Sequence, residues 1–87
     1  MDETIGTALR NARFRSGKSL SEMARLIHVS KSALDNYELG VRQIPEYVIV
    51  AYWQITHDED VRTVAVASAL MEMVEFYTAF ATPPRVA

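Results

Sequence analysis

SLSEMARLIHVSKSALDNYE, which occupies residues 19–38, is the stretch that decides the fold of this chain. Its apolar positions fit two short helices joined by a tight turn, and the small Ala24 lies where the second helix must approach the first closely. These apolar positions are Met23, Ala24, Ile27, Val29, Leu34 and Tyr37. The spacing predicts a helix-turn-helix.

Residues that favour helix ends mark the borders of both helices. Ser19 and Glu22 form an S-x-x-E capping box, in which each side chain satisfies a backbone donor of the other residue. Ser30 is a suitable N-cap for the second helix. Gly40 is a suitable C-cap, because glycine adopts the left-handed conformation without steric cost. We therefore expect the second helix to lie between Ser30 and Gly40.

Eight residues in and around this motif stand at fixed offsets: Gly17, Ser19, Ala24, Val29, Ser30, Leu34, Glu38 and Gly40. With this spacing, about residues 5–55 of the chain resemble the phage repressor and Cro-like (Xre) family of DNA-binding proteins. The resemblance implies an all-α, lambda-repressor-like fold, which is a four- to five-helix bundle with a helix-turn-helix. In this chain a long C-terminal helix is expected to follow it.

The resemblance also implies which side chains contact DNA. The base-reading positions of the family correspond to Lys31, Ser32 and Asn36. The positions that contact the DNA backbone correspond to Ser19, Ser30 and Arg42. The chemistry suits the major groove, because lysine donates to guanine, asparagine bonds bidentately to adenine, and serine adapts to several bases.

Two further features follow from the same resemblance. Arg13 and Glu38 lie where the family pairs an arginine of the first helix with a glutamate that ends the recognition helix. A structural ion pair is therefore implied. His28 stands where the family usually has glycine, at a position that needs a positive φ. Histidine tolerates this conformation less well than glycine and better than branched residues.

Two positions depart from the family pattern. Leu20 replaces a residue that is often polar and contacts phosphate in relatives. Asp35 is unusual on a helix face that meets DNA. We expect it either to hold Lys31 across one helical turn or to be solvated, and acceptance of a hydrogen bond from cytosine is the weaker alternative.

The net charge of −2 at pH 7 is low for a DNA-binding protein, since affinity for DNA comes largely from neutralising phosphates. The charge is unevenly distributed. Residues 1–45 hold seven basic and five acidic side chains, whereas residues 46–87 hold two basic and six acidic ones. This reversal is expected if the first part faces nucleic acid and the second faces protein and solvent. We expect weak non-specific binding and poor binding by a monomer.

Composition limits the class of protein further. The chain has 87 residues, 49% of them hydrophobic, which suits one small helical domain. There is no cysteine, and His28 and His57 are too few and too far apart for metal-ligand spacing, so no metal or cofactor is expected. Acidic residues near the N-terminus and charges within the apolar C-terminal segment argue against a secretory signal and a membrane span. We expect a cytoplasmic protein with no membrane partner.

Helices are also predicted on both sides of the motif. Residues 4–16 carry apolar side chains at helical spacing, including Phe14, and Gly17 then stops this helix. Pro45 fits the first turn of a fourth helix. The aromatic residues of that helix are Tyr47, Tyr52 and Trp53. We expect them in the core, and the alternative is that they stack on single-stranded nucleic acid.

The chain divides into a helix-turn-helix DNA-binding domain at residues 1–56 and a C-terminal helix within residues 57–87. Asp58 is a good N-cap, and residues 61–81 contain no glycine or proline, which predicts a helix about 30 Å long. Its apolar residues occupy more than one face, so that one face can pack on the bundle and the surplus needs a partner. We expect a homodimer through Leu70, Met73, Val74, Tyr77 and Phe80. The alternatives are a dimer through the fourth helix and one intramolecular core.

The leading hypothesis is a sequence-specific regulator of transcription that binds double-stranded DNA as a dimer, as a repressor of phage or mobile-element type. Two recognition helices would enter successive major grooves. The alternative is a protein-interaction module, such as an antitoxin or phage adaptor, that binds another protein through its apolar C-terminal helix. An enzyme with a small-molecule substrate is the poorest option, because the sequence has no nucleophile elbow, phosphate loop or metal-ligand spacing.

Overall fold

The computed structural model describes the backbone of residues 2–67 and the side chains of residues 5–67. Within this range the protein is all-α, which confirms the predicted fold class. Four helices span Asp2–Arg15 (α1), Leu20–Ile27 (α2), Lys31–Leu39 (α3) and Glu46–Thr56 (α4), and a further helix covers residues 59–67. None of these helices is both long and apolar enough to cross a membrane. The predicted dimerisation residues lie outside the described residues: Leu70, Met73, Val74, Tyr77 and Phe80.

Caps define the ends of α2 and α3, as the sequence predicts. The hydroxyls of Ser19 and Ser30 each accept a hydrogen bond, 3.0 Å long, from the backbone N–H three residues later. His28 and Gly40 end the two helices in the left-handed conformation, with φ of 67° and 78°. Glycine has no Cβ to clash in this conformation, whereas His28 adopts it at a steric cost that the turn must offset.

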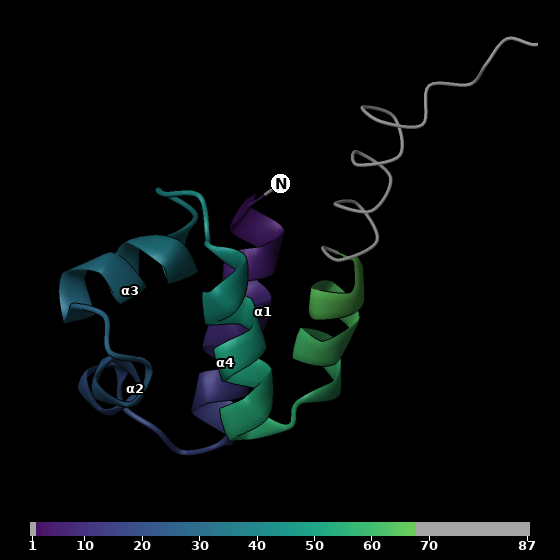
Figure 1. The fold of residues 1–87 in the computed structure, drawn as a ribbon, viewed down its shortest axis with the longest axis horizontal. Coiled ribbons are helices and arrows are strands. Elements are labelled where there is room, and N and C mark those ends of the chain that lie inside the picture. The colour runs from purple at the N-terminus through teal and green to yellow at the C-terminus, as the bar shows by residue number, and fades with distance from the viewer. Residues whose placement is uncertain (1, 68–87) are drawn as a thin grey trace, which may run out of the picture.

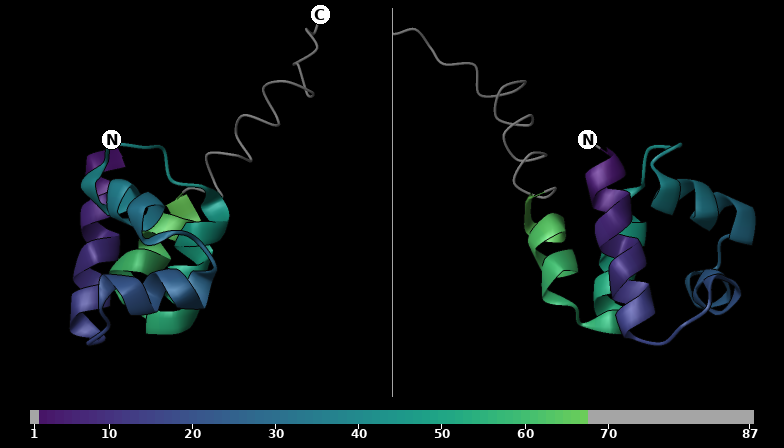
Figure 2. Two further views of the ribbon diagram at one scale, coloured as in Figure 1. Left: turned by 90° about the vertical axis from the view of Figure 1, so that its left-hand side faces the viewer. Right: turned by 180° about the vertical axis from the view of Figure 1, so that it is seen from behind.

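The helices form a bundle with α1 and α4 at its centre (Figure 1). The pair α2 and α3 lies on one side of this centre and the helix at 59–67 lies on the other, and the same order is seen from behind (Figure 2). α1 contacts both α3 and α4, while α2 contacts α3. In both figures, none of the other described helices lies over the side of α3 that faces away from α1 and α4.

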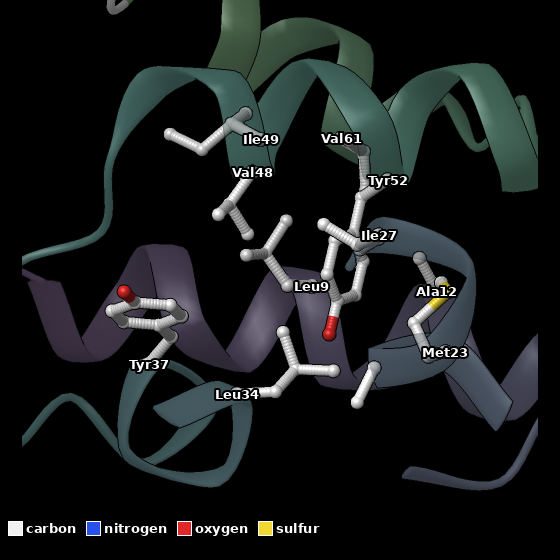
Figure 3. Packing of buried hydrophobic residues seen from close by; sticks show 11 residues of the cluster. Leu9, Ala12, Met23, Ile27, Leu34, Tyr37, Val48, Ile49, Tyr52 and Val61 are labelled. Atoms are coloured by element: carbon white, nitrogen blue, oxygen red, sulfur yellow. The ribbon is translucent and has the colours of Figure 1, made fainter. Parts of the chain in front are cut away.

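The core draws on every described helix. Figure 3 shows Leu9 of α1 between Val48 of α4 and Leu34 of α3, with the Tyr52 ring beside them. Each member of the core is at most 8% exposed: Leu9, Ala12, Met23, Ala24, Ile27, Leu34, Tyr37, Val48, Ile49, Tyr52 and Val61. Val61 is fully buried, so the start of the helix at 59–67 belongs to the same core as α1 to α4.

An ion pair on the surface joins the end of α1 to the start of the helix at 59–67. Arg15 donates from Nε to Oδ2 of Asp58 at 2.8 Å and from Nη2 to Oδ1 at 3.0 Å. The carboxylate of Asp58 also accepts a hydrogen bond from the backbone N–H of Asp60. Asp58 therefore caps this helix, as the sequence predicts. The guanidinium of Arg15 lowers the pKa of Asp58 from its ordinary value. The exposed pair therefore helps to orient this helix, although such pairs stabilise folded proteins little.

Two details of the sequence prediction are wrong. Tyr47 is 58% exposed, so it does not belong to the core. It fits helical spacing, but it lies near the start of α4 and falls off the face that carries the buried Val48 and Tyr52. Pro45 is the N-cap of α4 and does not lie within its first turn.

α1 and α3 approach each other closely at Gly6. A Cβ atom on Gly6 would lie 2.5 Å from the carbonyl oxygen of Glu38 and 2.6 Å from that of Tyr37. Both oxygens belong to the backbone of α3, so they cannot move aside without a shift of the helix. Only glycine fits this crossing.

We expect Gly6→Ala to destabilise the protein by about 2 kcal/mol, because the added methyl group overpacks the crossing of α1 and α3. At an open position within a helix, the same change stabilises by about 0.5–1 kcal/mol. Urea unfolding of both proteins measures the difference. Asn11→Ala, at an exposed position of α1, is the matched control and should change stability by less than about 0.5 kcal/mol. A Gly6→Ala variant as stable as the wild type would contradict the close approach.

Candidate nucleic-acid interface

α3 divides into an inner face and an outer face. Leu34, Tyr37 and Glu38 are buried against the bundle. The outer face carries four polar side chains, of which all but the half-buried Asn36 are exposed: Lys31, Ser32, Asp35 and Asn36. The three residues predicted to read bases therefore share one solvent-facing surface, with Lys31 and Ser32 in the first turn and Asn36 one turn later.

The two capping serines keep a free donor for a phosphate. In each cap the hydroxyl oxygen of Ser19 or Ser30 accepts a backbone hydrogen bond, which leaves its own O–H to donate. Both serines are exposed, and they lie at the N-termini of α2 and α3. A helix N-terminus also presents unpaired backbone N–H groups and the positive end of the helix dipole. Each start can thus bind an anion, although the two lie on different helices.

A buried network holds the other end of α3. Arg13 of α1 donates from Nε to Oε2 and from Nη2 to Oε1 of Glu38, both at 2.8 Å. Its Nη1 donates to the carbonyl of Lys18 at 3.1 Å. The hydroxyl of Tyr52, from α4, donates to Oε2 of Glu38 at 2.5 Å. The pair that the family resemblance implies is present, and it has a third partner.

The third partner, Tyr52, was missed by the sequence prediction, which assigned this residue to the core alone. Its ring is indeed buried, and burial together with the hydrogen bond to Glu38 raises the pKa of its hydroxyl. A buried tyrosine hydroxyl usually finds a hydrogen-bond partner, which was the available signal. The sequence did not show that this partner would be Glu38, because the contact depends on how α4 packs.

The network fixes the position of α3 in the bundle. The side chains of Arg13 and Glu38 are 9% and 2% exposed, so both charges have lost most of their hydration. Such a pair offsets its desolvation only when its geometry is good and its remaining lone pairs are satisfied. The bidentate contact and the Tyr52 hydroxyl meet this condition in one arrangement of α1, α3 and α4. The network therefore specifies how far the outer face of α3 projects from the bundle.

The loop after α3 is tied back to the same helix. The carbonyl of Asn36 accepts from the backbone N–H of Val41 at 3.0 Å and from that of Arg42 at 3.4 Å. The N–H of Gly40 donates to the carbonyl of Tyr37 at 3.2 Å. Arg42, the predicted contact to the DNA backbone, is exposed and follows this capped turn directly. Its backbone is thus held at the C-terminal end of α3.

Within the described residues, no group of three or more histidine, aspartate or glutamate side chains is placed to hold a metal ion. Asp58 and Asp60, at the start of the helix at 59–67, instead bind Arg15. Asp58 also caps this helix.

In this all-α bundle, α2 and α3 are both capped and are joined by a short turn in which His28 has the left-handed conformation. α3 exposes a polar face. These features define a helix-turn-helix protein. A helix-turn-helix domain family matches residues 4–79, which is most of the chain, and the chain belongs to this family. The structure is similar to the crystal structure of the clp gene regulator ClgR from Corynebacterium glutamicum. The two share 20% sequence identity and a TM-score of 0.63, with 95% of each chain covered, which shows a common fold. No curated protein matches the chain.

We expect Tyr52→Phe to destabilise the protein by about 1.5–3 kcal/mol, because it removes a hydrogen bond to a buried carboxylate and leaves the ring in place. Urea unfolding at pH 7 measures the change. Tyr47→Phe removes the same hydroxyl from an exposed tyrosine of the same helix and should change stability by less than about 0.5 kcal/mol. Equal losses in the two variants would show that the hydroxyl of Tyr52 has no special role.

Proposed function

We propose that this protein is a sequence-specific regulator of transcription that binds double-stranded DNA through α3. The outer face of α3 carries the proposal, because its exposed lysine and serine and its half-buried asparagine suit base edges in the major groove. In finer detail, we propose a dimeric repressor of the Xre or Cro-like type, as found in phages and mobile elements. Bound at an operator, such a dimer would exclude polymerase from the promoter.

The polar groups on and around α3 would have two different roles, base reading and phosphate contact. Lys31, Ser32 and Asn36 would read bases, since lysine pairs with guanine and asparagine with adenine. Ser19, Ser30 and Arg42 would contact phosphates and so set the position of α3 in the groove. Asp35 lies on the same exposed face, where its charge repels phosphates. A carboxylate at this place restricts how α3 can approach DNA, which favours a defined site over non-specific binding.

Membership of the helix-turn-helix family and the fold shared with a gene regulator support the same proposal. In helix-turn-helix proteins the second helix of the motif generally enters the major groove, and its N-terminal residues contact base edges. In this chain those residues are Lys31 and Ser32. The buried network at the other end of α3 would then act as the support from which the N-terminal half projects.

Dimerisation is proposed because one unit offers few charges to DNA. α3 itself contributes the exposed Lys31, and the loop after it contributes the exposed Arg42. Arg13 also lies beside α3, but it is buried and paired with Glu38. Few phosphate contacts give weak binding. Two copies on two half-sites add their binding energies. We propose that the C-terminal element, residues 57–87, forms the interface, with the five apolar residues from Leu70 to Phe80 named above.

The first experiment measures binding to duplex DNA. We expect Lys31→Ala combined with Asn36→Ala to weaken binding to the selected operator at least about 30-fold, since each base contact contributes about 1–3 kcal/mol. Arg62→Ala combined with Asn11→Ala removes one cation and one amide from surfaces away from α3 and is the matched control. It should bind the operator within about twofold of the wild type. Equal losses in the two double variants would place the interface elsewhere.

The second experiment measures assembly. Light scattering at micromolar concentration should give twice the chain mass of 9.8 kDa. Selection from a random duplex pool should enrich a two-fold symmetric site, with half-sites about 10 base pairs apart. Val74→Glu should give a monomer with weak operator binding, whereas Glu72→Gln should remain dimeric.

A monomeric wild type would contradict the proposed dimer. A wild type that binds no duplex, yet forms a stable complex with another protein, would assign the chain to the alternative class of protein-interaction modules.

A further inference from the structure

We infer that Tyr37 is a positioning residue for DNA binding, whose ring holds the guanidinium of Arg42 beside α3 before DNA arrives. The inference rests on the proposed function and deepens it. The Tyr37 ring would support the proposed contact between Arg42 and the DNA backbone, because the arginine side chain would otherwise be free to move. The position of Arg42 would then depend on a residue that never touches DNA.

The geometry that carries the inference is a cation over an aromatic face. The Cζ atom of Arg42 lies 5.7 Å from the centroid of the Tyr37 ring. A guanidinium within about 6 Å of a ring centroid is attracted to the negative face of the π-system. Arg42 is exposed, so this contact is not enforced by burial of the arginine.

The ring itself is fixed. Tyr37 is 7% exposed and belongs to the hydrophobic core, and Figure 3 shows it at one end of the packed cluster. Its carbonyl oxygen accepts from the N–H of Gly40 and lies at the close crossing with Gly6. A guanidinium held over this ring therefore has a fixed position relative to the core of the protein.

The backbone ties Arg42 to the same helix. The carbonyl of Asn36 accepts from the N–H groups of both Val41 and Arg42. Asn36 is a proposed base reader, so the base reader and the phosphate contact share one hydrogen-bonded turn. The Tyr37 ring extends this coupling from the backbone of Arg42 to its side chain.

The contact with the ring leaves the arginine able to bind a phosphate. The Cζ atom lies over the ring at 5.7 Å, and the guanidinium keeps its five N–H donors for hydrogen bonds. Immobilising a long side chain on binding costs about 0.5–1.5 kcal/mol, and an arginine that is already ordered loses less. A lysine at the same place keeps the charge, but its compact and strongly hydrated ammonium binds less readily to an aromatic face than a guanidinium does.

A double-mutant cycle on binding to the selected operator tests the coupling. We expect Arg42→Lys to weaken binding about two- to fivefold in the wild-type protein, which is the range of an exposed cation–π contact. In a Tyr37→Leu background the same change should have almost no effect. Tyr37→Phe keeps the ring and should preserve the full effect of Arg42→Lys. The slope of affinity against salt should stay constant, because every variant keeps the charge.

Arg25→Lys serves as the matched control, since Arg25 is exposed in the last turn of α2. Its effect should be the same with and without Tyr37. Urea unfolding establishes that each variant is folded at the assay temperature. If Tyr37→Leu is not folded, Tyr37→Met replaces it, and proton NMR of the free wild type gives a second measurement. The side-chain resonances of Arg42 should be shifted by the ring current relative to those of Arg25.

The outcomes are distinct. If Arg42→Lys weakens binding equally with and without the Tyr37 ring, or if the Arg42 resonances show no ring-current shift, Tyr37 has no positioning role and the proposed function stands. If the wild-type protein shows no salt-dependent binding to duplex DNA, both the proposed function and this inference are overturned.

Discussion

The fold depends most on the carboxylate of Glu38, which is buried and receives hydrogen bonds from Arg13 and Tyr52. These three residues come from α3, α1 and α4, so one charged group holds three helices in register. A buried carboxylate that loses a donor is costly, and arrangements that break the contact are therefore disfavoured. The close crossing at Gly6 acts on the same turn of α3 through its backbone. The C-terminal half of the helix is thus fixed by both side-chain and main-chain contacts.

This support explains how a short helix can present a defined surface. α3 has nine residues, which is too few for stable helix formation in isolation. Its end is held by the network, its start by the Ser30 cap, and its inner face by the core. The outer face needs no apolar residue for stability, so its side chains are free to be chosen for binding. On the proposed function, stability and recognition therefore lie on opposite sides of one helix.

The sequence predicted those features that arise locally or at fixed offsets. The serine caps and the Gly40 end follow from neighbouring residues, and the ion pair between Arg13 and Glu38 follows from the family resemblance. The role of Tyr52 and the stacking of Arg42 on the Tyr37 ring were not predicted, because both depend on how segments pack in three dimensions. Helical spacing placed Tyr47 in the core wrongly, since near a helix end it does not show where the neighbouring helices stop. The residues chosen for DNA contact remain predictions, although α3 presents its three on one face.

The small positive charge near α3 makes preorganisation more important than it is for a strongly basic protein. When many cations meet DNA, the loss of order in any one side chain changes affinity little, because counterion release dominates binding. On the proposed function, this protein relies on a few contacts, so the position of each has a larger effect on the total. On that proposal, the guanidinium over the core Tyr37 and the base-reading amide of Asn36 belong to one hydrogen-bonded turn and act as a unit. Such a unit would bind more tightly at sites where both the base contact and the phosphate contact fit, and more weakly where only the phosphate contact fits. A protein with few cations could thereby discriminate between DNA sequences.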